Sequence, residues 1–299
     1  MDDRSLACFI AVAQTLNFRR AAQGLHLTQP ALSARIRGLE VELGVSLFER
    51  DRRHVALTPA GQALLPHARA ACANIEEGKL QAQRAARGEA GGLRVGFTVL
   101  AMYDLVPHCV REFRERFPSV EIELSEMNSP ALEAALVSGA VDVAILHPPL
   151  HTSGLEAVPL VDEPLVLALP SAHPLARRKV IPVRDLRDEP ILIAPRSIGP
   201  SIFDRIIALF LAQGFSPRIV QEVTPMTSLV GLVSAGVGMG LVTRGLARLP
   251  RPGVSYRPLR PEAPRLPFAF AWRGPLSPTG RRFLETVKRG VQRRVPDRG

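Results

Sequence analysis

The chain has 299 residues and a formal net charge of +10 at pH 7, from 38 Lys and Arg against 28 Asp and Glu. At 46% hydrophobic residues it can build packed cores, and its length predicts two or three folded parts. No stretch is long and uncharged enough to span a membrane, and the three cysteines fit neither a disulfide framework nor a metal site. We therefore expect a cytoplasmic protein with no membrane partner and no metal or other cofactor. The basic excess favours a polyanion such as DNA.

Residues 17–61 have the pattern of two short helices followed by a basic hairpin. Thr28 is a good N-cap, and Pro30 suits the first turn of the helix that follows. Apolar residues at helical spacing predict one buried face on each helix. These are Phe18, Ala21, Ala22 and Leu25 on the first, and Leu32, Ile36, Leu39 and Leu43 on the second.

The opposite face of the second helix is polar and short-chained near its N-terminus. It carries Pro30, Ser33, Ala34 and Arg37, with Gln29 at the tip. Such a face suits insertion into a DNA major groove. Spacing alone leaves open an ordinary small helical bundle with a solvated charged turn.

The hairpin that follows has apolar flanks and a charged tip, residues 49–54. Arg50, Arg52 and Arg53 at this tip predict a wing that reaches phosphates or a minor groove.

Together these residues resemble the DNA-binding module of LysR-type transcriptional regulators. The shared motifs lie between Phe9 and Pro66: Phe9-x-Ala11-Val12-Ala13, Asn17-Phe18-x-x-Ala21-Ala22, Thr28-Gln29-Pro30-Ala31-Leu32-Ser33, Leu39-Glu40-x-x-Leu43-Gly44, Leu47-Phe48-x-Arg50 and Leu57-Thr58-x-Ala60-Gly61. The resemblance implies a winged helix-turn-helix domain over residues 1–58, with the helix-turn-helix at about 18–37.

Within this domain we expect a division of labour on DNA. Gln29 and Ser33 should touch base edges, and Pro30 should pack on a base or sugar. Basic side chains should contact phosphates or enter the minor groove. The candidates are Arg35 and Arg37 for phosphates and Arg53 for the minor groove.

Residues 59–88 predict a long, Ala-rich linker helix. Thr58 is its cap, and apolar residues recur near heptad spacing: Leu64, Ala68, Ala71, Ile75 and Ala82. Such a seam suits a dimerisation arm. The alternative is a helix that packs only on its own domain. A glycine-rich break at 88–92 ends the segment.

From residue 93 the pattern changes to alternating strands and helices, typical of an α/β fold with a largely parallel sheet. We expect a first lobe at about 93–163 and 268–299, with a helix over 103–117, and a second lobe at about 164–267. Two lobes joined by two crossovers enclose a cleft, as in periplasmic binding proteins. The expected fold is thus an N-terminal all-α winged helix-turn-helix, a long linker helix and a two-lobed α/β effector-binding domain. The family resemblance implies the same.

The cleft should be lined by loops at the carboxyl ends of strands and by adjoining helix N-termini. The family resemblance implies that effectors bind at such loops, which gives seven candidate effector ligands: Thr98, Val99, Ser129, Pro195, Arg196, Ser197 and Thr227. An inward Arg196 needs an anionic partner, which suggests a small organic or aromatic acid as effector. The alternative is that the hydroxyls of Thr98, Ser129 and Ser201 only cap helices.

Other motifs do not support a different chemistry. Residues 236–240 are glycine-rich but should follow a helix, the reverse of a dinucleotide-binding turn, so we interpret them as a tight turn. His147 and His151 are separated by two prolines that forbid a helix, which argues against a metal site. No residues form a recognisable catalytic setting. An enzyme or a transport receptor with a binding-protein fold would leave Gln29, Pro30 and the arginine wing unexplained.

The sequence therefore predicts a transcriptional regulator and not an enzyme. The resemblance implies a homotetramer, built as a dimer of dimers, that controls transcription from operator DNA in response to a small effector. RNA polymerase is a candidate further partner. We expect the effector to act by changing the angle between the lobes and so the spacing of the DNA-reading heads.

Overall fold

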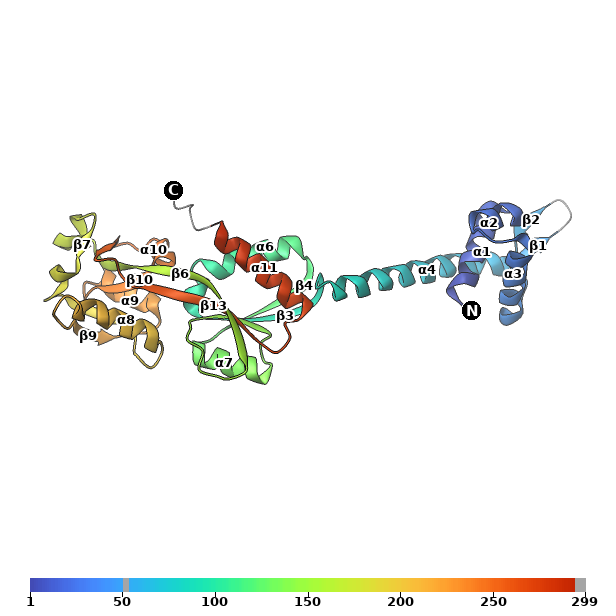
Figure 1. The fold of residues 1–299 in the computed structure, drawn as a ribbon. Coiled ribbons are helices and arrows are strands. Elements are labelled where there is room, and N and C mark those ends of the chain that lie inside the picture. The colour runs from blue at the N-terminus through green and yellow to red at the C-terminus, as the bar shows by residue number, and fades with distance from the viewer. Residues whose placement is uncertain (51–53, 294–299) are drawn as a thin grey trace. The chain divides into compact units, whose positions relative to one another are not determined.

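The computed structural model describes residues 1–50 and 54–293 (Figure 1). It divides into two compact units, Met1–Arg84 and Ala85–Gly299. Within the described ranges no helix combines the length and the apolar character needed to cross a membrane.

The first unit begins with three helices, each opened by a side-chain cap. They are α1 (Asp3–Thr15), α2 (Phe18–Gly24) and α3 (Gln29–Leu43). The side chains of Asp2, Asn17 and Thr28 each accept a hydrogen bond from the backbone N–H three residues on. Caps of this kind satisfy N–H groups that the first helical turn leaves unpaired. A short antiparallel hairpin of β1 (Phe48–Arg50) and β2 (Val55–Leu57) follows.

The core of this unit joins the helices to the root of the hairpin. The Phe48 ring lies 5.5 Å from that of Phe9 and 5.7 Å from that of Phe18. Leu32, Ile36 and Leu39 are buried as predicted, but the prediction for Leu43 is wrong, because it is 37% exposed. Leu43 is the last residue of α3, where Gly44 turns the chain away with φ of +70°. The apolar face of α3 therefore extends one residue beyond the part that the core covers.

Helix α4 (Pro59–Ala86) carries the predicted seam, but the seam has two different environments. Ala68 is buried, and Leu64 and Ala71 pack against the core of the first unit. Ile75, further along, is 38% exposed. The alternative of packing on its own domain thus holds for the first half of the seam. Only the second half is left uncovered.

The second unit contains a mixed sheet in the order β4-β3-β5-β13-β6-β10, with β11 also paired to β6. In the first lobe β3 (Ala90–Phe97) pairs in parallel with β4 (Ser119–Glu126) and β5 (Val143–Leu146). The long strand β6 (Leu155–Pro170) and β13 (Arg265–Arg273) then pair antiparallel. The prediction of a largely parallel sheet is wrong here, because the chain leaves and re-enters the first lobe along this antiparallel pair.

Within residues 85–293 of the second unit, four helices belong to the first lobe. They are α5 (Val99–Met102), α6 (Leu105–Arg116), α7 (Ser129–Ser138) and α11 (Pro278–Gln292). Helix α11 lies beside α6 (Figure 1), with the Phe113 and Phe283 rings 5.2 Å apart. The helix predicted over 103–117 is confirmed as α6, which begins two residues later than expected because Asp104, with a φ of −148°, is not helical. The short helix α5 precedes it and was not predicted.

The second lobe is built on the far half of β6. Strands β10 (Gly240–Thr243) and β11 (Val254–Arg257) pair antiparallel with it. The other elements are β8 (Pro190–Ile193) parallel to β9 (Arg218–Glu222), β7 (Ile181–Pro182) parallel to β12 (Leu259–Arg260), 3-10 turns at Pro174–Arg177 and Val183–Leu186, and helices α8 (Pro200–Leu211), α9 (Met226–Ser234) and α10 (Arg244–Ala247).

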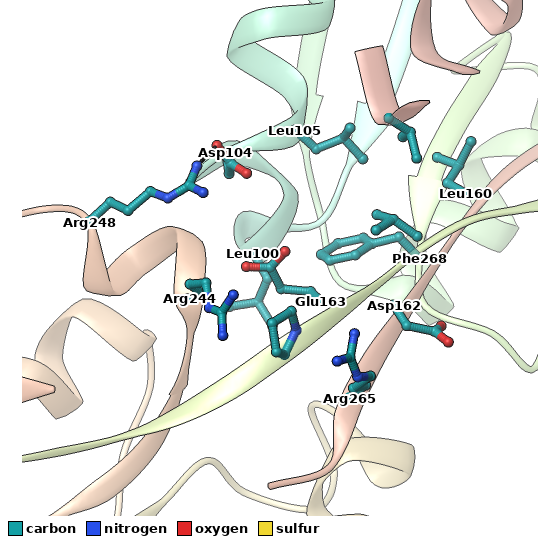
Figure 2. A pocket seen from close by; sticks show the side chains of 13 residues that line it. Leu100, Asp104, Leu105, Leu160, Asp162, Glu163, Arg244, Arg248, Arg265 and Phe268 are labelled. Atoms are coloured by element: carbon teal, nitrogen blue, oxygen red, sulfur yellow. Dashed lines mark hydrogen bonds and ion pairs between the residues drawn. The ribbon is translucent and has the colours of Figure 1, made fainter. Parts of the chain in front are cut away.

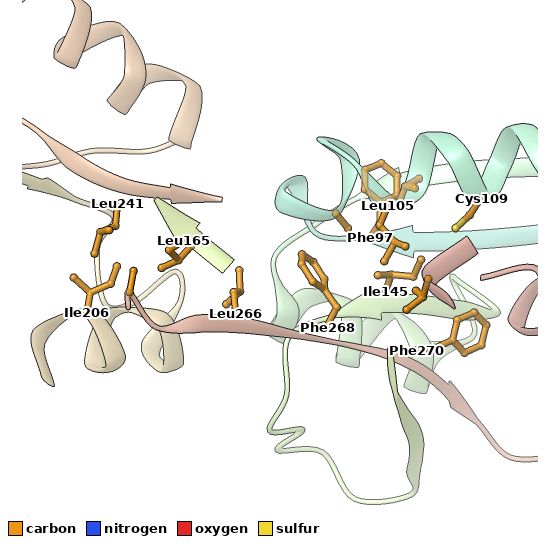
Figure 3. Close-up of a cluster of buried hydrophobic side chains, with 14 of the residues drawn as sticks. Phe97, Leu105, Cys109, Ile145, Leu165, Ile206, Leu241, Leu266, Phe268 and Phe270 are labelled. Atoms are coloured by element: carbon orange, nitrogen blue, oxygen red, sulfur yellow. The ribbon is translucent and has the colours of Figure 1, made fainter. Parts of the chain in front are cut away.

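The two lobes share one hydrophobic core along the β6–β13 pair. Figure 3 shows Leu165, Leu266 and Leu241 continuing toward Phe268 and Phe270 of the first lobe. The glycine-rich residues 236–240 form the predicted turn between α9 and β10. A Cβ on Gly238 would lie 2.7 Å from the Pro190 carbonyl oxygen, so the close approach of the two chains requires glycine.

Candidate DNA-reading surface and effector cavities

The N-terminal end of α3 presents the predicted DNA-reading residues with different exposures. Gln29, Pro30 and Arg37 are exposed, and Ser33 is half-buried. Arg35 is half-buried too and lies near α1, where its charge adds to the hydrogen bonds from Ser5 that lower the pKa of Asp2. Arg35 is thus set apart from the exposed face. Arg53 lies outside the described residues.

The root of the hairpin is held to α3 by hydrogen bonds between a side chain and the backbone that the sequence did not reveal. Oε1 of Glu40 accepts from the N–H of Leu47 at 2.9 Å and of Phe48 at 3.3 Å. At the other end, Thr58 Oγ1 donates to the Ser46 carbonyl oxygen at 2.7 Å. The resemblance included Glu40 and Thr58, but their role depends on the folded chain.

A cavity of about 490 Å³ lies between the two lobes of the second unit. The first lobe contributes Ser129, Glu133, His147 and the prolines after it, and the second contributes the start of α8 and the loop before it. Of the seven predicted effector ligands only Ser129 and Arg196 line this cavity. The other five, which do not line it, are Thr98, Val99, Pro195, Ser197 and Thr227.

His147 connects the predicted residues Thr98 and Ser129. Its Nδ1 lies 3.0 Å from the Pro267 carbonyl oxygen, which can only accept, so Nδ1 carries the proton. Nε2 therefore accepts from Thr98 Oγ1 at 3.1 Å. The backbone N–H of His147 donates to Ser129 Oγ at 3.2 Å. Burial lowers the pKa of His147 to about 4, so this ring is neutral at pH 7.

Arg196 already has an anionic partner within its own lobe. Its Nε and Nη2 each lie 2.8 Å from a carboxylate oxygen of Asp204 on α8. This pairing raises the pKa of Arg196 and lowers that of Asp204. Arg196 therefore has an anionic partner without a ligand, and its role in binding an effector stays a prediction. Asp204 leaves three of the five guanidinium N–H donors for other partners, since it takes two.

None of the three hydroxyls considered as helix caps acts as one. Thr98 occupies the N-cap position of α5 without a capping hydrogen bond. Helix α7 is capped by Asn128, and the N-cap of α8 is Gly199. The hydroxyls of Thr98 and Ser129 bond to His147 instead.

The remaining predicted residues lie outside the lining of the cavity. Val99 and Pro195 are half-buried, and Ser197 is exposed. Thr227 is exposed at the start of α9 and hydrogen-bonds Tyr103 of the first lobe. Burial raises the pKa of Tyr103, and the hydrogen bond with Thr227 opposes part of that rise.

Sequence reasoning missed three groups that shape the cavity: His147, Glu133 and Asp204. Glu133 is buried, and its Oε2 accepts from the N–H of His151 at 3.0 Å and of Thr152 at 2.7 Å, which holds the loop wall. His147 directly follows the buried strand β5, so the rule that selected Thr98 could also have selected it. Across the described residues no three His, Cys, Asp or Glu side chains group as a metal site.

A second cavity of about 430 Å³ also lies between the lobes and contains none of the predicted ligands (Figure 2). Asp104 of the first lobe and Arg248 of the second form an ion pair of 3.0 Å at its edge. A Cβ on Gly245 would lie 2.9 Å from that of Asp104. The lobes therefore meet closely on this side.

Two protein families match the chain over most of its length. Bacterial regulatory helix-turn-helix protein, lysR family, matches residues 4–62, and LysR substrate binding domain matches residues 86–292. The chain belongs to the LysR family of transcriptional regulators. The fold class and the regulatory function predicted from the sequence are thereby confirmed.

Individual relatives agree with this assignment. The regulator is 45% identical over 257 residues to HTH-type transcriptional regulator AlsR of Bacillus subtilis (strain 168), covering 86% of this chain and 85% of that one. It is similar to the LysR family regulator CbnR, with a TM-score of 0.90, 30% identity and coverage of 96% and 100%. Full-length CbnR complexed with its target DNA is similar with a TM-score of 0.85 and 29% identity, covering 97% of this chain and 100% of that one. The BenM effector binding domain with its effector benzoate is similar with a TM-score of 0.60 and 28% identity, covering 67% of this chain and 91% of that one.

Proposed function

We propose that this LysR-family regulator reads operator DNA with the N-terminal end of α3. The observation that carries the proposal is the division of α3 into two faces. Leu32, Ile36 and Leu39 are buried, while Gln29 and Pro30 are exposed at the helix start. A helix N-terminus with short polar side chains can enter a major groove and reach base edges.

In this proposal Gln29 and Ser33 touch bases, and Pro30 packs on a base or sugar. Arg37 is exposed and suits a phosphate contact. Arg35 is proposed for a phosphate contact too, although it is half-buried and its charge also acts on Asp2, the N-cap of α1. Arg53 is proposed for the minor groove on sequence grounds. The relative CbnR has been solved with its target DNA, which supports this mode of binding.

Binding to the DNA upstream of the regulator's own gene tests the proposal. Fluorescence anisotropy would compare that DNA with a shuffled duplex for the wild type and for Gln29→Ala. The variant should lose about 1–3 kcal/mol on the specific site and little on the shuffled one. Gln23→Ala, an exposed glutamine of α2, is the matched control. Equal losses on both duplexes would contradict base reading by Gln29.

We further propose that the 490 Å³ cavity takes the effector, a small organic acid. Arg196 has N–H donors left beside Asp204, and Ser129 and Ser201 supply hydroxyls. The proline and aliphatic side chains that line the cavity suit the apolar part of such an acid. BenM, a relative, has been solved with benzoate in its effector binding domain. Thr98 and Thr227 would act from outside the cavity, through His147 and Tyr103.

The last part of the proposal concerns assembly and partners. We propose a dimer of dimers in which the uncovered half of the α4 seam pairs with a second copy. We also propose that the protein regulates transcription and is not an enzyme, and that RNA polymerase is a partner. The exposure of Ile75 in a single subunit supports the pairing. The effector would change the angle between the lobes and, through it, the spacing of the DNA-reading domains.

A further inference from the structure

The second cavity, of about 430 Å³, shares no lining residue with the proposed effector cavity. Its walls come from both lobes. Figure 2 shows Leu105, Leu160 and Phe268 on one side and Glu163, Arg244 and Asp104 toward the other. This division distinguishes an apolar side from a charged one.

The apolar side can receive a small hydrocarbon group. Leu105, Phe268 and Val291 are nearly completely buried in the protein around the cavity, and Leu160 lies on the same side, whereas Leu100 lies toward Glu163 (Figure 2). The volume of about 430 Å³ lies within the usual range of small-molecule sites.

On the charged side, two of the three guanidiniums already have partners. Arg248 pairs with Asp104 at 3.0 Å, and Arg265 pairs with Glu262 at 2.9 Å. Among the described residues no hydrogen bond or ion pair is formed by the Arg244 side chain. Of the two other carboxylates, that of Glu163 lies toward Arg244, whereas that of Asp162 points away on the side of Arg265 (Figure 2). One positive and one negative group are thus available to a ligand on this side.

Figure 2 shows the carboxylate of Glu163 beside the side chain of Arg244. Burial and the charge of Asp104 raise the pKa of Glu163, whereas the Gly245 hydrogen bond and the charges of Arg248 and Arg244 oppose that shift. Oε1 of Glu163 accepts one hydrogen bond, from the Gly245 N–H at 2.8 Å. A carboxylate can accept about four hydrogen bonds, so this half-buried group has capacity for a ligand donor.

We propose that this cavity binds a small zwitterion, an amino acid with an apolar side chain. Its ammonium group donates to Glu163, its carboxylate accepts from Arg244, and its side chain lies against Leu105 and Phe268. Adjacent opposite charges on the protein match the adjacent opposite charges of an α-amino acid. Because both lobes form the walls, the bound molecule stabilises their observed arrangement.

Calorimetry with the full chain tests the ligand class through molecules that differ only in charge. One series is L-phenylalanine, 3-phenylpropanoate and 2-phenylethylamine, and the other is L-leucine, 4-methylpentanoate and 3-methylbutylamine. We expect at least one amino acid to bind, and its acid and amine to bind at least about tenfold more weakly. Absence of binding by both amino acids, or equal binding of the acid or amine, would overturn the proposal.

Variants then test the place of binding. Arg244→Ala and Glu163→Gln should each weaken the amino acid about tenfold or more. Arg114→Ala, an exposed arginine of α6, and Arg196→Ala in the other cavity should leave it unchanged. Unaltered binding by Arg244→Ala would place the ligand elsewhere and refute the site. Arg244 is exposed, so this variant should fold even if Glu163→Gln does not. DNA binding, measured separately, checks folding and keeps this test distinct from the proposed function.

Discussion

The carboxylate of Glu40 accepts a hydrogen bond from the backbone N–H of Leu47 at 2.9 Å. The next N–H, of Phe48, reaches the same oxygen at 3.3 Å. Glu40 lies on the helix proposed to read DNA, and Leu47 lies at the root of the hairpin. The Glu40 side chain therefore helps to hold the root of the hairpin against that helix.

We expect Glu40→Ala to weaken operator binding and to destabilise the DNA-binding domain by about 1–3 kcal/mol, because two backbone N–H groups lose their acceptor. Glu40→Gln, which keeps an acceptor oxygen, should lose less. Hydrogen exchange at the Leu47 and Phe48 amides should accelerate in Glu40→Ala, and anisotropy would report DNA affinity. Glu42→Ala is the control, since Glu42 pairs with the N-terminal amine at the surface. Slow exchange in Glu40→Ala would contradict the anchoring role.

The uncovered half of the α4 seam predicts a specific assembly defect. Ile75→Asp should reduce the size of the species seen by sedimentation and weaken operator binding, because a charge would be buried in the paired seam. The melting of the DNA-binding domain should change little, since Ile75 is 38% exposed in one subunit. Asn74→Asp adds the same charge at the neighbouring exposed position and should leave the assembly intact. An unchanged oligomer in Ile75→Asp would remove α4 as the dimer arm.

The neutral His147 ring predicts a pH dependence of stability. Its pKa is lowered from 6.5 to about 4, so the unfolded chain binds a proton between these pH values that the folded protein does not. The contribution of His147 to the free energy of unfolding should therefore be fully present above about pH 6.5 and should fall by about 3 kcal/mol as the pH drops to 4.

Denaturant unfolding of wild type and His147→Gln at several pH values checks this dependence. Glutamine keeps one donor and one acceptor but does not titrate, so the slope between pH 4 and 6.5 should be smaller in the variant. His151→Gln changes an exposed histidine of the same loop and should keep the wild-type slope. The same slope in His147→Gln as in wild type would show that His147 does not cause it.

The proposed effector site is tested with Arg196 and Asp204. Arg196→Ala should abolish the response to an acid effector while leaving basal DNA affinity within a few-fold. Asp204→Asn should weaken it less, because the asparagine still orients the guanidinium through one oxygen. Thr98→Val should have a smaller effect still, as its hydroxyl bonds to His147.

Calorimetry against aromatic and aliphatic acids, followed by DNA binding with the best acid, measures these effects. Arg205→Ala, an exposed arginine on the same helix as Asp204, is the control. If Arg196→Ala binds the acid as well as the wild type does, the proposed orientation is wrong. A neutral molecule as the only ligand would contradict the acid as effector class.

The sequence by itself determined the elements whose causes are local. The cap at Thr28, the apolar spacing of α3 and the turn at Gly236, whose φ is +80°, each depend on residues a few positions away or on backbone geometry. Because helix and strand periodicities are local properties, the two α/β lobes and the exposed face of α3 could be predicted.

Tertiary structure alone decided what those elements meet. Leu43 has the helical spacing of a core residue but no surface to cover it, and Ala68 of the seam is covered by its own domain. His147 binds Thr98 and Pro267, which are 49 and 120 residues away in the chain. The pairing of Arg196 with Asp204 likewise depends on how a loop returns to α8. Burial and hydrogen-bond partners depend on which distant segments pack together, and no local pattern of residues encodes that.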